Sequence, residues 1–188
     1  MIQKLFVIAL AVVALSACGS RVEGGEQLTV NGQAVPLSLY NALVAAEEQK
    51  VERSGATISS QSPAGQRRKA KIESSVIREL MRDTVVGQLA EAHGIRLTAA
   101  ELQQRVSMAE QAFGGPVPFE EALQQAGISR ADFASILRFR VLESQLSRLG
   151  TGGAAAIDDA VKKARVVVTI GPCARSRAYP ACLSTTPA

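Results

Sequence analysis

The side chains best suited to covalent or metal chemistry are few in this 188-residue chain, which contains three cysteines and one histidine. No two cysteines have the close spacing of a zinc site, and His93 alone cannot complete a plausible ligand set. No Ser/His/Asp or Cys/His arrangement for nucleophilic catalysis is recognisable. No glycine-rich loop opens a helix after a strand, as a phosphate site requires. The sequence therefore predicts no catalytic centre, no cofactor and no metal.

Cys18 stands in a context that predicts lipid modification. Lys4 supplies a positive charge, and the apolar stretch Leu5–Leu15 that follows is too short to span a bilayer. The sequence LSAC, which ends at Cys18, resembles the bacterial lipobox, in which the cysteine is acylated and becomes the mature N-terminus. We expect residues 1–17 to be a lipoprotein signal peptide and residues 18–26 a lipidated tether, with several acyl chains giving stable anchoring. The alternative is a plain secretory signal with an incidental Cys18.

The residue after the cysteine bears on location. In bacteria with two membranes, an aspartate at this position resembles an inner-membrane retention signal, and this chain has Gly19. The sequence therefore predicts an extracytoplasmic protein that is lipid-anchored to a bacterial membrane. If the cell has an outer membrane, the periplasmic face of that membrane is the expected location.

The other two cysteines are interpreted through this compartment, because exported proteins meet oxidising conditions. Cys173 and Cys182 form an even pair once Cys18 is committed to lipid. We expect a disulfide that closes a short loop in a C-terminal tail of residues 172–188, with the end from Leu183 onward disordered. In the chain-entropy model, such a loop stabilises the fold by about 2–3 kcal/mol. The alternative is two free thiols.

The elements that position these residues are predicted to be mainly helical. Apolar residues make up 47% of the chain but aromatic residues only 4%, so Ala, Leu and Val must provide most of the burial. This composition favours one domain of helices packed through small side chains. The formal net charge of +4 is too small to indicate binding of nucleic acid.

Apolar periodicity and capping residues locate the helices. Thr98 and Ser129 each precede an acidic residue by three positions, which is the pattern of a capping box. The fifth helix is expected to direct a stripe from Phe133 to Leu149 inward. The predicted helices span residues 37–53, 63–93, 98–113, 119–126, 129–149 and 154–163.

Two segments far apart in the chain have strand character. Asn31-Gly32, between apolar residues, predicts a tight hairpin, with an ordinary surface turn as the alternative. Residues 165–170 (RVVVTI) are strongly β-branched. Because a lone terminal strand needs a partner, we expect the N-terminal hairpin and this C-terminal strand to form a small sheet beside the helices.

In this order, the elements resemble the N-terminal chaperone domain of SurA- and PrsA-type extracytoplasmic folding factors. The resemblance covers roughly residues 28–170 and implies a chaperone domain over residues 27–171 that binds unfolded exported polypeptides. It is carried by the succession GIRLTAAEL (94–102), FGG (113–115), FEEALQQAGIS (119–129) and DF (132–133).

The chain departs from this family pattern at one place. Members usually carry a parvulin-type prolyl isomerase domain between the fifth helix and the final helix and strand. Here that place holds only Gly150-Thr151-Gly152-Gly153. The resemblance therefore implies client binding without isomerase activity, and the protein is not expected to be an enzyme.

Client binding of this kind needs an apolar surface, adaptable side chains and no fixed catalytic group. The candidates are Met81, Met108, Phe113 and Phe119. Each falls on or beside a helical stripe, so ordinary core packing is the favoured alternative. The basic run Arg67–Lys71 could meet anionic lipid or an acidic client, although a solvated helix face is the more common role of such a run.

Three functions compete. The first is a membrane-tethered chaperone that acts by reversible apolar contact. The second is a degenerate isomerase, which the missing domain opposes. The third is an adaptor or structural lipoprotein that binds one dedicated partner, and the sequence separates it poorly from the first. The sequence does not determine the oligomeric state.

Overall fold

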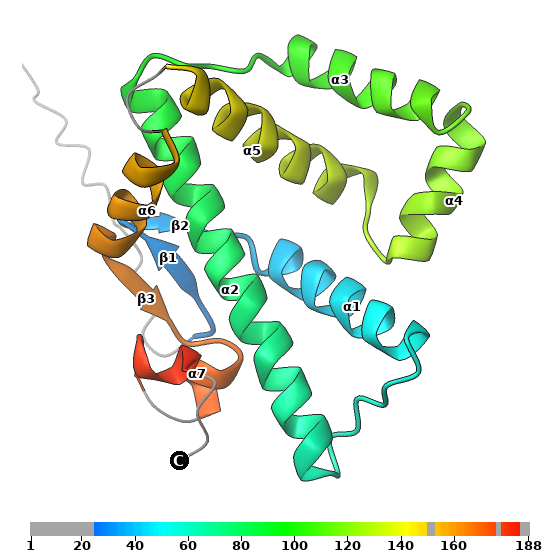
Figure 1. The fold of residues 1–188 in the computed structure, drawn as a ribbon, viewed down its shortest axis with the longest axis vertical. Helices are drawn as coiled ribbons and strands as arrows, with labels where there is room; N and C mark the ends of the chain where they lie inside the picture. Colours follow the sequence, from blue (N-terminus) through cyan, green and yellow to red (C-terminus); the bar gives the residue numbers. More distant parts are fainter. Residues whose placement is uncertain (1–24, 150–152, 176–177, 185–188) are drawn as a thin grey trace, which may run out of the picture.

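The computed structural model describes residues 25–149, 153–175 and 178–184. Helix α2 (Pro63–Ala92) is the longest element, and the other elements are arranged around it (Figure 1). It begins where the sequence predicts, because Ser62 accepts a hydrogen bond from the Gly65 backbone N–H at 3.0 Å and Pro63 occupies the first turn. Cys18, its tether up to residue 24 and the joint at residues 150–152 lie outside the described residues.

The expected small sheet joins the two ends of the domain. It contains β1 (Leu28–Val30), β2 (Gln33–Ala34) and β3 (Val166–Val168) in the order β2-β1-β3, with both pairs antiparallel. Asn31 and Gly32 have φ of 53° and 83°, the left-handed values that a tight hairpin turn requires. The strand β3 is shorter than the predicted 165–170, because β1 offers only three residues to pair with.

Helix α1 (Leu37–Arg53) packs along α2, and the next three helices form an arm that projects from it (Figure 1). In this arm, α3 (Ala99–Ala112) and α5 (Arg130–Arg148) lie side by side and α4 (Pro116–Ala126) crosses their far end. Arg53 Nη1 donates to the Gln125 carbonyl at 2.9 Å, which links the ends of α1 and α4.

The two predicted capping boxes are present, and two other predictions for the arm are wrong. Helix α4 begins at Pro116 rather than Phe119, because proline is well suited to a first helical turn, where its missing N–H leaves no bond unmade. Leu149, predicted to point inward, is 49% exposed, because α5 ends at Arg148 and Leu149 caps it beyond the last buried turn.

The C-terminal segment packs on the body of the domain. It contains α6 (Gly153–Lys163), α7 (Pro172–Arg175) and a 3-10 turn (Ala181–Leu183). A disulfide joins Cys173 to Cys182. Leu183, expected in a disordered end, is instead buried, and its carbonyl accepts a hydrogen bond from Arg78 Nη1 at 3.0 Å.

Three apolar clusters hold these elements together. The main cluster lies among the sheet, α1, α2 and the C-terminal turn, and a second joins α2 to α5 and α6. The arm has a small core of its own, formed by Val106, Phe119 and Leu123. Within the described ranges, no helix is both long enough and apolar enough to cross a bilayer.

Candidate functional site

The structure divides the four candidate client-binding residues between core and surface. Met81 and Phe119 are 3% and 0% exposed, so neither can meet a client in this conformation. Met81 belongs to the main cluster and Phe119 to the core of the arm. Met108 and Phe113 are 60% and 53% exposed, and both lie toward the far end of α3.

Exposed apolar side chains gather at this end of the arm. Five large apolar residues are strongly exposed in the described part of the chain, and three of them lie between Met108 and Val117. We call residues 108–117 the arm tip; it is the corner between α3 and α4 (Figure 1). Sequence reasoning missed Val117, because it interpreted residues 114–118 as a break between helices rather than the start of α4.

The arm tip rests on a fixed aromatic base. The Phe113 and Phe119 ring centroids are 5.7 Å apart, and Phe119 and Phe133 are 5.1 Å apart, both with edge-to-face geometry. Gly114 and Gly115 turn the chain with φ of 94° and 114°, which other residues rarely adopt. The exposed side chains are therefore held on a defined scaffold.

Arg130 reinforces this base from the start of α5. Its guanidinium lies 5.2 Å from the centroid of the Phe119 ring, within the range of a cation–π contact. Its Nη1 donates to Glu110 Oε2 at 3.0 Å, and its Nε lies 3.3 Å from Glu120 Oε1. One side chain therefore connects α3, α4 and α5 beneath the tip.

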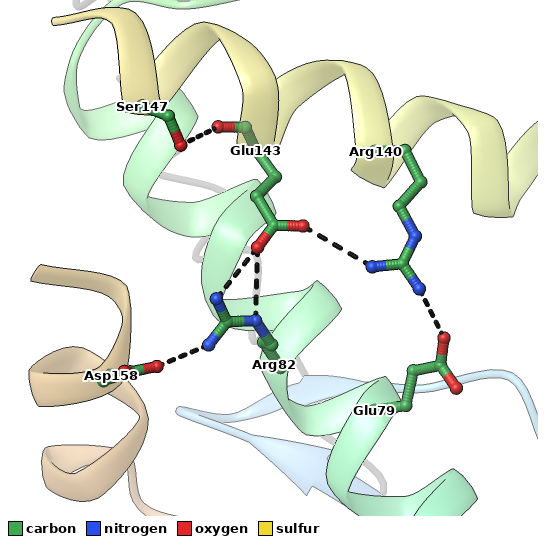
Figure 2. Close-up of polar contacts among 6 residues, drawn as sticks. All are labelled: Glu79, Arg82, Arg140, Glu143, Ser147 and Asp158. Atoms are coloured by element: carbon green, nitrogen blue, oxygen red, sulfur yellow. Dashed lines mark hydrogen bonds and ion pairs between the residues drawn. The ribbon is translucent and has the colours of Figure 1, made fainter. Parts of the chain in front are cut away.

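An ion-pair network attaches the arm to α2 and α6 (Figure 2). Arg82 Nη2 donates to Glu143 Oε1 at 2.8 Å, and Arg82 Nη1 donates to Asp158 Oδ1 at 2.5 Å. Arg140 Nη2 donates to Glu79 Oε1 at 2.7 Å. Because these side chains are partly exposed, each pair contributes little stability, about 1 kcal/mol or less. They connect α5 of the arm to α2, and α2 to α6.

A buried carboxylate lies next to this network. Asp83 is 5% exposed, and no described residue forms a hydrogen bond or ion pair with it. The pKa of Asp83 is raised to about 6, mainly by burial; Arg140 and Arg82 lower it, and Glu79 and Glu143 raise it. One turn on, a Cβ at Gly87 would lie 3.5 Å from Cε1 of Phe139, so this face of α2 meets α5.

The described residues contain no group of three or more His, Cys, Asp or Glu that could hold a metal ion. The arrangement offers apolar contact at the arm tip and charged contact along the helices.

These features define a mainly helical domain with an exposed apolar tip. A family model of the SurA-like N-terminal domain matches residues 1–147, and the chain belongs to this family. No parvulin domain is evident in the 188 residues. Such domains are typically extracytoplasmic and have a chaperone-type or prolyl-isomerase-associated role. No curated protein matches the chain, and no solved structure matches it.

The matched range ends within the last turn of α5, before α6 and β3. Those two elements are nevertheless part of the same fold, because β3 pairs with β1 and α6 packs against α2.

The buried carboxylate gives a pH-dependent prediction. Because the pKa of Asp83 is raised above its unfolded value, the native state holds the proton more tightly. The stability that this proton provides is fully present below the unfolded pKa and is lost as the pH rises through about 6. Between pH 5 and pH 7.5 the wild type should lose about 1 kcal/mol through this group. Asp83→Asn should abolish that loss when both proteins are unfolded in urea at the two pH values.

Asp159→Asn is the matched control, because Asp159 is an exposed carboxylate on α6. It should follow the wild type at both pH values. If the difference in unfolding free energy between Asp83→Asn and the wild type is the same at pH 5 and pH 7.5, the raised pKa assigned to Asp83 is contradicted.

Proposed function

We propose that this chain is a membrane-anchored extracytoplasmic chaperone that binds unfolded exported polypeptides and does not catalyse proline isomerisation. The observation that carries the proposal is the concentration of exposed apolar side chains, Met108, Phe113 and Val117, at the arm tip. Single exposed apolar residues are common on protein surfaces, but three within ten residues on a rigid base favour a contact surface.

The tip is suited to contacts that form and break. Partial burial of each of these side chains against a client contributes about 1 kcal/mol. Contacts this weak hold an unfolded chain only when several act together, and they release it without nucleotide or covalent chemistry. Methionine adapts to different client surfaces because its side chain is flexible and polarisable.

The absence of isomerase activity is part of the proposal. It is supported by family membership through the N-terminal domain, by the lack of an evident parvulin domain and by the lack of a recognisable catalytic arrangement in the sequence.

The anchoring of the protein is also proposed, from the lipobox resemblance at Cys18. The short tether would enter the fold at β1, and Figure 1 places the sheet and the arm tip at opposite sides of the molecule. Anchoring at the sheet would therefore leave the tip directed away from the membrane, toward emerging clients.

The tip hypothesis predicts the effect of making it polar. Residues 19–188, which include every described residue, should suppress light scattering by a denatured exported protein at a small molar ratio. Met108→Ser/Phe113→Ser/Val117→Ser should raise the ratio needed for half-suppression by about tenfold or more, because the apolar contacts are lost. In the same preparations, isomerisation of a proline tetrapeptide should proceed at its uncatalysed rate.

Leu149→Ser/Val167→Ser provides the matched control, since these are the other two strongly exposed apolar residues of the described chain. This variant should retain wild-type suppression. No suppression of several unrelated clients by the wild type would reject the chaperone and favour an adaptor with one dedicated partner.

The anchor predicts lipid incorporation at one residue. Cells that express the complete chain and are fed an alkyne-labelled fatty acid should label the wild type and should not label Cys18→Ser. The unlabelled variant should also leave the membrane fraction. Equal labelling of both proteins would remove the case for lipidation at Cys18.

A further inference from the structure

A second surface lies between α1 and α2, away from the arm tip. It is a groove of about 510 Å³ between the C-terminal half of α1 and the N-terminal half of α2. This volume falls within the range of ligand-binding clefts, about 300–1,000 Å³. Its floor is apolar and rigid, because Ile72 and Val76 are buried in the main cluster and Val51 packs against it.

The acidic side chains on the rim of this groove are already neutralised. Glu47 Oε1 lies 3.2 Å from Lys50 Nζ, and Glu79 accepts from Arg140 of the arm at 2.7 Å. Neither acid is therefore free to attract a cationic ligand.

Two cations on the rim remain uncompensated. Arg68 Nη1 donates to the Thr57 backbone carbonyl at 2.9 Å, which satisfies a donor but leaves the positive charge. Lys71 is exposed and has no hydrogen-bond or ion-pair partner among the residues that the structure describes. The two residues are three positions apart on α2 and therefore share one face above the apolar floor.

A second groove of similar volume does not have this property. It has a volume of about 560 Å³ and is flanked by Lys69 and Arg175. Those cations are paired with Glu48 and Glu73, respectively. Free positive charge above an apolar floor therefore distinguishes the groove between α1 and α2, which we call the basic groove, from this second groove of similar volume.

We propose that the basic groove binds segments of the unfolded client in which an apolar side chain is flanked by a carboxylate. The apolar side chain would lie on Val51, which is half-buried and lines the groove together with the buried Ile72 and Val76, and the carboxylate would lie between Arg68 and Lys71. The proposal rests on the proposed chaperone function and adds a client preference to it: the arm tip selects for apolar character alone, and the groove adds selection for negative charge.

Fluorescence anisotropy with three labelled peptides tests this preference. The peptides share one leucine- and valine-rich centre and differ only in their flanks, which carry glutamate, glutamine or lysine. The purified chain should bind the glutamate-flanked peptide about tenfold more tightly than the lysine-flanked one, the order of effect expected of two surface ion pairs. Raising the salt concentration should reduce this ratio, because the charges are exposed.

Arg68→Gln/Lys71→Gln should bring the three affinities within about twofold of one another. Lys71→Gln alone should lower the ratio part of the way, and it leaves the Arg68 contact with the loop intact. Arg105→Gln/Lys163→Gln, which removes two exposed cations on α3 and α6, should keep the wild-type ratio.

The outcomes separate this inference from the chaperone function. Equal binding of all three peptides by the wild type would overturn the groove assignment and leave the chaperone function standing. Binding of none would reject both. If Arg68→Gln/Lys71→Gln still prefers the glutamate-flanked peptide, the site that binds the carboxylate lies elsewhere on the chain, and the groove assignment is overturned. A last outcome concerns lipid, tested with vesicles of phosphatidylglycerol and phosphatidylethanolamine (1:3). If these vesicles bind the wild type but not Arg68→Gln/Lys71→Gln, and the wild type shows no preference among the peptides, the groove binds lipid and the proposal is overturned.

Discussion

The burial of α2 is the constraint on which the rest of this structure depends. Apolar side chains emerge on several sides of this 30-residue helix, so it must be covered by more than one neighbour. The sheet and α1 cover one part, and α5 and α6 cover another through contacts with Val86 and Ala90. The family match ends near the end of α5, but a fold that ended there would lose α6 and β3 and expose part of the α2 surface.

Covering α2 also determines where the candidate surfaces lie. Helix α5 attaches the arm to α2. Its Arg140 pairs with Glu79, which also lines the basic groove, so this ion pair links the arm to the groove (Figure 2). The arm tip offers the apolar side chains of Met108, Phe113 and Val117, and its Glu110 is paired with Arg130. Under the proposed function, apolar contact at the tip and charge-assisted contact in the groove would be complementary ways of holding an unfolded chain.

The fold could be predicted well from the sequence because its signals are local. The capping residues Thr98 and Ser129 give the starts of α3 and α5, and Asn31-Gly32 gives the hairpin. The pairing of β3 with β1 followed from elimination, since a lone strand needs a partner. The predicted start of α4 is wrong. The turn predicted at Gly114 and Gly115 was extended to include Pro116 and Pro118, but these prolines lie in the first turn of the helix.

The candidate site was less predictable, because exposure depends on which helices meet. Met81 and Met108 both fall on or beside a predicted helical stripe, yet Met81 is 3% exposed and Met108 is 60% exposed. The Arg82–Glu143 contact joins residues 61 positions apart, and no periodicity within either helix reveals it. Asp83 is buried, whereas its neighbour Arg82 is partly exposed, because adjacent positions on a helix point in different directions.

The central claim, that the arm tip contacts unfolded clients, is tested most directly by site-specific photo-crosslinking. A benzophenone amino acid would replace Phe113 in one preparation and Leu149 in another, since the two native side chains are similarly exposed, at 53% and 49%. Each preparation would be irradiated with a denatured exported protein. The account predicts strong crosslinks from position 113 and weak ones from position 149, and crosslinks of equal strength, or from position 149 alone, would contradict it.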